Sequence, residues 1–456
     1  MTTTQAWSIT LLIICTLQNH LITTKADKIS SLPGQPNANF QQFSGYINVD
    51  EKKERFLFYY FVEAETEPDS KPLVLWLNGG VGCSSFGVGA FVEHGPFRPN
   101  GKVLVRNNYS WNKAANMLYL ESSAGVGFSY STNKSFYKYV DDKITTRDNL
   151  KFLEKWIEEF PEFKEREFYI TGEGYSGHYA PQLASLIIQS KSKLSLKGVA
   201  IGNPLLEFDT DRNSAAEFWW SHGLISDFTY KQLTFVCNYS QILRQYDNKP
   251  MTPDCKRVSK LLRSEISDFV DYYDVTLDIC LSPVALQARV LNKLRDEPKI
   301  DVCVEDETYV YLNRKDVQKA LHARLFGVKE WGMCSSVVDY DRKNIETPTN
   351  GILGSLAKSN IRVLVFSGDQ DSVTPLIGTR TLVNQLAKQL GLNTTQPYRA
   401  WLEAKQVAGW TQSYGDYLSY ATIRGASHMA PFSQPERSLL LFSSFVAGKP
   451  LPVVKA

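Results

Sequence analysis

A strand, a tight turn and a helix follow one another over residues 167–177, whose sequence is EFYITGEGYSG. The turn is flanked by glycines, and apolar residues at helical spacing follow it. This is the setting of a nucleophile elbow, in which a serine stands on a strained turn at the top of a strand. The apex position is Gly174, which has no hydroxyl group. The pattern therefore predicts the scaffold of a nucleophilic site without its nucleophile.

The elements around this turn are those of an α/β protein. Apolar, β-branched and aromatic runs predict sheet strands at residues 55–64, 72–80, 116–125, 167–174, 196–202, 361–366 and 417–423. Residues 146–160 and 436–446 have the spacing of amphipathic helices, stopped by Pro161 and by Gly448 with Pro450. This order predicts a mixed central sheet with helices on both faces.

The stretch 206–330 has a different character, because it is poor in strand patterns and holds four cysteines. Residues 258–270 within it predict an amphipathic helix. We expect a mainly helical, disulfide-bonded insertion over the carboxyl ends of the strands, where open α/β sheets bind ligands. Residues 27–205 and 331–456 would then form the core.

Residues 1–26 predict a cleaved secretory signal, since their apolar stretch WSITLLIICTL is too short to span a bilayer. A buried core helix is the alternative. The mature cysteines are Cys83, Cys237, Cys255, Cys280, Cys303 and Cys334. In an exported chain their even number and lack of CxxC spacing favour disulfides over metal ligation, with fifteen pairings open. Glycosylation sequons at Asn108, Asn133, Asn238 and Asn393 agree with a secreted or vacuolar protein.

The overall charge argues against an electrostatically driven partner. Fifty Lys and Arg residues nearly balance 48 Asp and Glu, leaving a formal charge of +2 and no long basic run. We therefore expect no nucleic-acid or membrane partner, and no metal or cofactor. The oligomeric state, including a homodimer, stays open.

Four motifs in one order resemble the serine carboxypeptidase family, and most closely its plant carboxypeptidase-like branch. They are WLNGGVGCSS at 76–85, GEGYSGHY at 172–179, SGDQD at 367–371 and GASH at 425–428. The resemblance runs from about Leu32 to the C-terminus and implies an α/β-hydrolase fold. The family removes C-terminal residues from peptides at acid pH through a Ser-Asp-His triad. Here Gly174, Val81 and Ser123 depart from its usual serine and two prolines.

The resemblance also implies roles for individual residues. Asp371 and His428 would be the acid and base of the triad, in the chain order of α/β-hydrolases. The backbone amides of Gly80 and Tyr175 would form the oxyanion hole, which does not depend on side chains. Taken singly, Asp371 and His428 could equally be structural, and Gly79-Gly80 a mere turn after a strand.

The substrate's terminal carboxylate would be held by four residues of the family motifs: Asn78, Gly79, Glu93 and Glu173. Two glutamates facing a third carboxylate cannot all be ionised, so at least one must keep a proton and binding should favour acid pH. Solvated loop glutamates are the simpler alternative. The disulfides implied by the resemblance are Cys83–Cys334, Cys237–Cys255 and Cys280–Cys303.

We therefore expect a protein that captures peptide C-termini and is catalytically impaired by Gly174. An active carboxypeptidase is the alternative, through Ser176, through an allele with serine at 174, or slowly through an activated water. Ser176 begins the following helix, so its hydroxyl should point away from His428. Acyl transfer is a third possibility, although it too passes through an acyl-serine.

Overall fold

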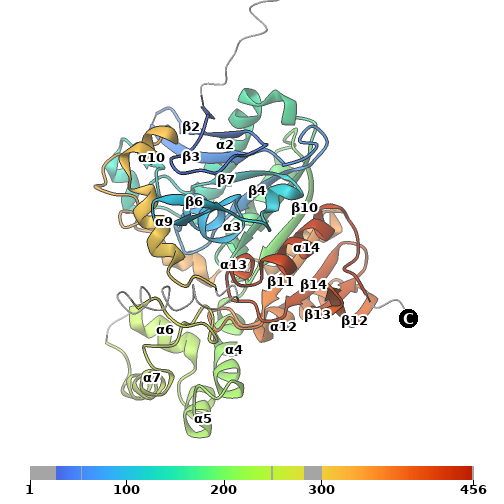
Figure 1. The fold of residues 1–456 in the computed structure, drawn as a ribbon. Coiled ribbons are helices and arrows are strands. Elements are labelled where there is room, and N and C mark those ends of the chain that lie inside the picture. The colour runs from blue at the N-terminus through green and yellow to red at the C-terminus, as the bar shows by residue number, and fades with distance from the viewer. Residues whose placement is uncertain (1–26, 53, 248–249, 282–299, 454–456) are drawn as a thin grey trace, which may run out of the picture.

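The computed structural model describes residues 27–52, 54–247, 250–281 and 300–453 (Figure 1). The predicted signal segment lies outside these residues. No helix within the described part is both long enough and apolar enough to cross a bilayer.

One large sheet forms the centre of the molecule. Its spatial order is β1 (Lys28–Ile29), β2 (Gln42–Asp50), β3 (Arg55–Val62), β7 (Asn116–Leu120), β4 (Leu73–Leu77), β9 (Glu167–Glu173), β10 (Ser195–Gly202), β11 (Arg362–Gly368), β14 (Leu418–Ile423), β13 (Gln406–Tyr414) and β12 (Thr394–Glu403). The strands from β7 to β14 are parallel, those at both margins are antiparallel, and β8 (Tyr130–Ser131) pairs with β3. This confirms the predicted mixed sheet.

Both faces of the sheet are covered, which explains why its strands read as continuous apolar runs. In β3, Leu57, Tyr59 and Phe61 enter one core cluster and the alternating residues enter the other. The first cluster includes α2 (Asp142–Glu159), α3 (Ser176–Gln189), α11 (Asn350–Lys358) and α12 (Leu376–Gln389). The second includes η1 (Ser85–Glu93), α9 (Val304–Leu312), α10 (Lys315–Ala320), α13 (Ala430–Ser433) and α14 (Pro435–Val446).

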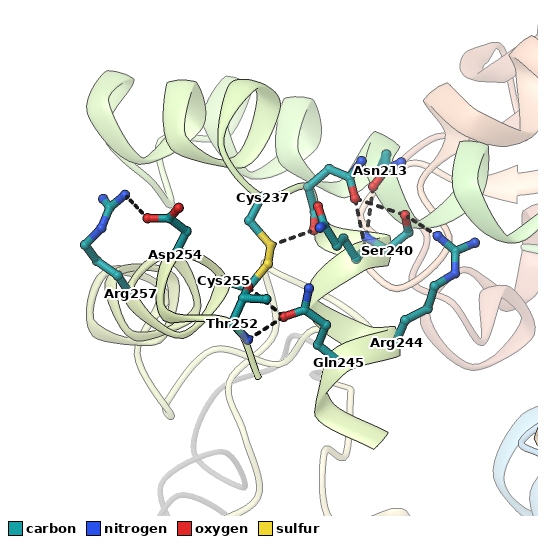
Figure 2. Close-up of a disulfide and its surroundings, with 11 residues drawn as sticks. Asn213, Cys237, Ser240, Arg244, Gln245, Thr252, Asp254, Cys255 and Arg257 are labelled. Carbon is teal, nitrogen blue, oxygen red and sulfur yellow. Dashed lines mark hydrogen bonds and ion pairs between the residues drawn. A yellow bond between two sulfur atoms is a disulfide. The ribbon is translucent and has the colours of Figure 1, made fainter. Parts of the chain in front are cut away.

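A helical lobe extends from the sheet, and in Figure 1 it is the light green part. It consists of α4 (Phe208–Ser221), α5 (Asp227–Phe235), α6 (Tyr239–Asp247) and α7 (Pro253–Ile266), which share a core of their own. Helix α7 begins and ends a few residues before the predicted 258–270. The disulfide Cys237–Cys255 joins the end of α5 to α7, and Gln245 accepts hydrogen bonds from Thr252 beside it (Figure 2).

The other two disulfides are Cys83–Cys334, which joins two segments of the predicted core just beyond the end of the insertion, and Cys280–Cys303, which lies within the insertion. All three pairs are those that the family resemblance implies. Helices α9 and α10 lie within the predicted insertion 206–330, yet Tyr311 and Val317 pack into the core under the sheet. Smaller elements are the hairpin β5 (Phe97–Asn100) and β6 (Val103–Arg106), and the helical turns η2 (Trp111–Lys113), η3 (Lys134–Lys138), η4 (Pro161–Phe163) and η5 (Arg342–Glu346).

Candidate active site

The sharp turn between β9 and α3 is the elbow that the sequence predicts. Its apex, Gly174, has φ +60°, a conformation that glycine adopts at little cost. The Gly174 amide donates to the Gly202 carbonyl at 3.1 Å, and the Gly177 amide donates to the Gly174 carbonyl at 3.0 Å. The turn is therefore fixed by its own backbone and by the end of β10.

His428 and Asp371 come together from the loops that follow β14 and β11. His428 Nδ1 lies 2.8 Å from Asp371 Oδ2, and Asp371 is fully buried. Asn203 Nδ2 donates to Asp371 Oδ2 at 2.9 Å, and the Val373 amide donates to Oδ1 at 2.8 Å. With the carboxylate on Nδ1, the other imidazole nitrogen, Nε2, faces the elbow.

Gly174 and His428 oppose each other directly. A Cβ atom built on Gly174 would lie 2.9 Å from His428 Nε2, and its next neighbour outside that ring would be Gly79 Cα at 3.9 Å. A side chain at this position would thus meet the tip of the imidazole before anything else. This is the geometry in which a serine hydroxyl would donate to a general base.

The Gly80 and Tyr175 amides approach the same point from two loops. A Cβ on Gly79 would collide with the Tyr175 amide nitrogen at 2.2 Å, so the two loops are in contact. Among the described residues, neither the Gly80 nor the Tyr175 amide donates a hydrogen bond. Both remain available to an oxyanion, the role that the family resemblance predicts for them.

Asn78 holds two buried glutamates in one cluster. Its Nδ2 donates to Glu173 Oε1 at 2.9 Å and to Glu93 Oε1 at 3.2 Å. Trp76 Nε1 donates to Asn78 Oδ1 at 2.5 Å, which fixes the orientation of the amide. The other oxygens, Glu93 Oε2 and Glu173 Oε2, are buried and have no partner among the described residues. We call Asn78, Glu93 and Glu173 the carboxyl cluster.

The carboxyl cluster holds protons more tightly than ordinary glutamates do. Burial raises the pKa of Glu93 to about 7, against hydrogen bonds from Asn78 and Glu173 that lower it. Burial, and then the charge of Glu93, raise the pKa of Glu173 well above its ordinary value. At acid pH a proton therefore sits between these carboxyls, where it can be donated to an incoming oxygen.

Ser176 lies close in sequence but not in the site. Its side chain is fully buried, and its Oγ packs against Gly172, where an added Cβ would meet it at 2.1 Å. Ser176 does not line the cleft that His428 lines. The hydroxyl points into the β9–α3 packing, as expected from its place at the start of the helix.

Asp142, at the start of α2, anchors the elbow from behind. Its carboxylate accepts hydrogen bonds from Tyr175 Oη at 3.1 Å, Tyr340 Oη at 2.7 Å and Gln182 Nε2 at 2.8 Å, and lies 3.0 Å from His178 Nδ1. Burial by itself would raise the pKa of Asp142. The contact with His178 and the hydrogen bonds from Tyr340 and Gln182 outweigh burial and keep this pKa below its usual value. Because Tyr175 carries one of the predicted oxyanion amides, the hydrogen bond from its side chain to Asp142 would restrain that amide.

A cleft of about 430 Å³ lies between the core and the insertion, and the core residues that line it include Asn78, Gly80, Glu173, Gly174, Tyr175 and His428. The insertion contributes Asp271, Tyr273, Leu277 and Glu305, among others. Tyr273 packs edge-on against the His428 ring with centroids 5.1 Å apart, and its carbonyl accepts the His428 amide at 2.8 Å. No group of His, Cys, Asp and Glu among the described residues has the arrangement of a metal site.

Reasoning from sequence missed several residues that shape this site. Asn203 directly follows the end of β10, and a polar residue at a strand's carboxyl end is a signal that could have been followed. Asp142 precedes a predicted helix and could have been noted as a capping position. Nothing local indicates Tyr273, because its contact with His428 spans 155 positions of the chain.

Comparisons with known proteins agree with this geometry. The serine carboxypeptidase profile matches residues 33–448. The chain belongs to the serine carboxypeptidase family. It is 60% identical to serine carboxypeptidase-like 45 of Arabidopsis thaliana over 94% of both chains, and 56% identical to serine carboxypeptidase-like 46 of that plant over 98% of both. The crystal structure of Kex1Δp, a prohormone-processing carboxypeptidase from Saccharomyces cerevisiae, matches with a TM-score of 0.74, 24% identity and coverage of 94% of this chain and 97% of that one.

The likeness to Kex1Δp confirms the predicted fold of serine carboxypeptidases, an α/β-hydrolase core with an insertion. Two further departures from the family motifs are Val81, which follows Gly80, and Ser123. Val81 is half-buried and packs against the main core cluster. Ser123 is buried, and its hydroxyl has no partner among the described residues.

Proposed function

We propose that this serine carboxypeptidase family member captures the C-termini of peptides and lacks the hydroxyl that would form an acyl-enzyme. The observation that carries the proposal is the placement of Gly174 opposite His428 Nε2, where a built Cβ would lie 2.9 Å from the ring. The hydrogen bond between His428 and Asp371, and the presence of Gly80 and Tyr175 in the same cleft, support the proposal. The activity expected of the family is removal of C-terminal residues at acid pH.

The carboxyl cluster supports capture of a terminal carboxylate. A peptide's C-terminus would approach Asn78 and accept a hydrogen bond from a protonated Glu93 or Glu173, whose second oxygens have no partner among the described residues. The scissile carbonyl would then lie near the amides of Gly80 and Tyr175. Binding and polarisation of the carbonyl do not require a side chain at position 174.

Formation of an acyl-enzyme does require a nucleophilic side chain at position 174. His428 can accept a proton, but only from a nucleophile, and Gly174 offers none. Removing the nucleophile of a serine protease lowers turnover by about 10⁶-fold, leaving roughly 10³–10⁴-fold from binding and the oxyanion hole. We therefore propose a catalytically impaired protein in which His428 and Asp371 remain in place without their serine.

The alternative of an active enzyme through Ser176 is disfavoured by the burial of its hydroxyl against Gly172. A fluorophosphonate probe separates the two readings. We expect no adduct on the purified protein, and an adduct at Ser176 would contradict the proposal. Acyl transfer depends on the same missing hydroxyl, and incubation with glucose-ester donors should give no transfer product.

The decisive test is Gly174→Ser. The new side chain requires the imidazole to move by a few tenths of an ångström, since a Cβ 2.9 Å from Nε2 is slightly too close. We expect release of C-terminal residues from a blocked dipeptide at pH 5 to rise by at least about 10³-fold. Gly174→Ser with His428→Ala is the matched control and should show no gain. Comparable activity in the unchanged protein would refute the proposal.

Export through the secretory pathway is part of the proposal, with a secreted or vacuolar destination. The three disulfides fit an oxidising compartment. The sequon residues Asn108, Asn133 and Asn393 are exposed and thus accessible to glycosylation. Asn238 is half-buried, and its Oδ1 accepts the Gln241 amide at 2.9 Å. A homodimer stays open.

A further inference from the structure

Arg98, on β5, is a partly buried cation without a carboxylate partner among the described residues. Its Nε–H is buried and has no hydrogen-bond acceptor there. One guanidinium nitrogen, NH2, donates to the Glu93 carbonyl at 2.7 Å and to the Pro431 carbonyl at 3.4 Å. A charge that is partly withdrawn from water, with one N–H buried and without an acceptor, is costly, so its presence calls for a compensating interaction.

The two carbonyls place Arg98 between the two halves of the site. Glu93 ends η1 and belongs to the carboxyl cluster, while Pro431 lies in α13, just after His428. The charge of Arg98 acts on the Glu93 carboxyl and lowers its pKa, against the larger effect of burial. Conversely, the charge of Glu93 partly offsets the burial that lowers the pKa of Arg98.

The charges around the carboxyl cluster do not balance without Arg98 once a ligand binds. Glu173 approaches from β9, and Asp371 acts on it from the loop after β11. His94, next to Glu93, is held uncharged because burial and then Arg98 lower its pKa, and it contacts the buried hydroxyl of Tyr119 at 3.1 Å. Among the described residues, His428 and Arg98 are the cations that lower the pKa of Glu93, and the guanidinium of Arg98 keeps its charge at every pH.

We infer that Arg98 is the fixed cation that offsets the negative charge which a bound C-terminus brings into the carboxyl cluster. It is thus a positioning and specificity-determining residue that favours carboxylate over amide ligands. Arg98 does this through Glu93, to whose carbonyl it is hydrogen-bonded. The inference rests on the proposed capture of C-termini. Beyond its hydrogen bonds to the two carbonyls, Arg98 would make the site prefer a ligand with a free carboxylate to one with a neutral amide.

The pH dependence distinguishes this role from simple packing. Removing the charge raises the proton affinity of Glu93, so the cluster keeps its proton to higher pH. The attraction for the ligand's carboxylate is lost at the same time. A neutral residue should therefore weaken binding at acid pH and also move the midpoint of the pH profile upward, a combination that general loosening of the site does not produce.

The experiment measures the affinity of a fluorescent tripeptide, as free acid and as C-terminal amide, between pH 4.5 and 8. The protein keeps Gly174, so the ligand is not consumed. We compare Arg98→Gln, which retains a donor for the carbonyls without charge, with Arg98→Lys, which retains the charge. For the free acid we expect about a tenfold loss with glutamine at pH 5 and a smaller loss with lysine. The affinity of the amide should change little in either variant.

Arg106→Met is the matched control, because Arg106 lies on the neighbouring strand β6 and pairs with Glu65 at 2.6 Å. It should leave both affinities unchanged. Near-ultraviolet circular dichroism checks that each variant folds. If Arg98→Gln does not fold, Arg98→Lys alone decides the question. The inference requires that Arg98→Lys keep the ratio of acid to amide affinity of the unchanged protein. Equal losses for acid and amide, or lysine and glutamine variants with the same acid-to-amide ratio, would overturn the inference. If the unchanged protein itself binds acid and amide equally, the proposed capture of C-termini fails instead.

Discussion

At the scale of single residues, the carboxyl cluster depends on one proton. Asn78 supplies two N–H donors, and each already points at a glutamate oxygen. A bound carboxylate would be a third acceptor, so at least one of Glu93 and Glu173 must donate. The site is therefore a carboxylate receptor only while that proton is present.

We predict that affinity for a free-acid peptide is highest below pH 6 and falls as the pH rises through about 7, where Glu93 loses its proton. Glu93→Gln keeps a donor at every pH and should flatten the profile. Titration calorimetry at a series of pH values measures both. Glu121→Gln is the control, because burial also raises the pKa of Glu121 to about 7, outside the cluster. A flat profile in the unchanged protein would contradict the prediction.

The same residue scale shows what a single sequence can predict. Gly174, Asp371 and His428 stand in short motifs, and the structure brings all three together. Tyr273 acts through a contact between segments far apart in the chain, so no local pattern indicates it, and Asn203 and Arg98 gain their roles from distant residues such as Asp371 and Pro431. The resemblance to a family carried the motifs, whereas the supporting contacts required the fold.

At the scale of elements, the elbow is held by α2 as well as by its own strand. Asp142 receives its bonds from Tyr175 in the elbow, from Gln182 and His178 on α3, and from Tyr340 in the segment that returns from the insertion. Four contacts to one buried carboxylate join three separate parts of the chain. The orientation of the Tyr175 amide depends on this connection.

We predict that Asp142→Asn lowers the free energy of unfolding by about 2 kcal/mol, because charge-assisted hydrogen bonds to a buried group are lost. In the Gly174→Ser background it should also lower kcat more than it raises KM, since the oxyanion amide is less well placed. Denaturant unfolding and steady-state kinetics measure the two effects. Lys143→Ala, at the exposed neighbouring position, should change neither quantity. An unchanged kcat would show that Asp142 is only structural.

Element prediction succeeded where burial on both faces produced apolar runs, as in β3, β4 and β9. It missed the marginal hairpin of β12 and β13, whose outer strand is largely exposed and polar. Such a strand carries no apolar alternation, and it forms because β14 offers β13 an open edge. The predicted domain boundaries stay a prediction, although α9 and α10 pack with the core.

At the scale of the whole molecule, buried carboxyls connect stability to pH. Burial raises the pKa of Glu93, Glu121 and Asp211 to about 7 in each case. These groups lie in three different places: the carboxyl cluster, the packing of β7 against Trp331, and the start of α4. Each binds a proton more tightly in the folded chain than in the unfolded one.

We predict that the protein is more stable at pH 5 than at pH 8. A raised carboxyl pKa favours the folded state fully below the unfolded value near 4.5, and this contribution is lost as the pH rises through about 7. Each group accounts for up to roughly 3 kcal/mol over that interval. Below about pH 4 the sign reverses for Asp142, whose pKa is lowered, so the optimum lies between these limits.

Thermal unfolding followed by circular dichroism from pH 4 to 8 measures this dependence, and Glu121→Gln supplies its control. Glutamine retains the size of the side chain but has no proton to lose, so the difference in Tm between pH 5 and pH 8 should shrink in the variant by several degrees. A Tm that rises steadily from pH 5 to 8 would show that the ionised forms are the ones stabilised by the fold. The expected direction suits a protein whose ligand site also needs acid, because folding and carboxylate capture then depend on protons held by the same class of buried carboxyl.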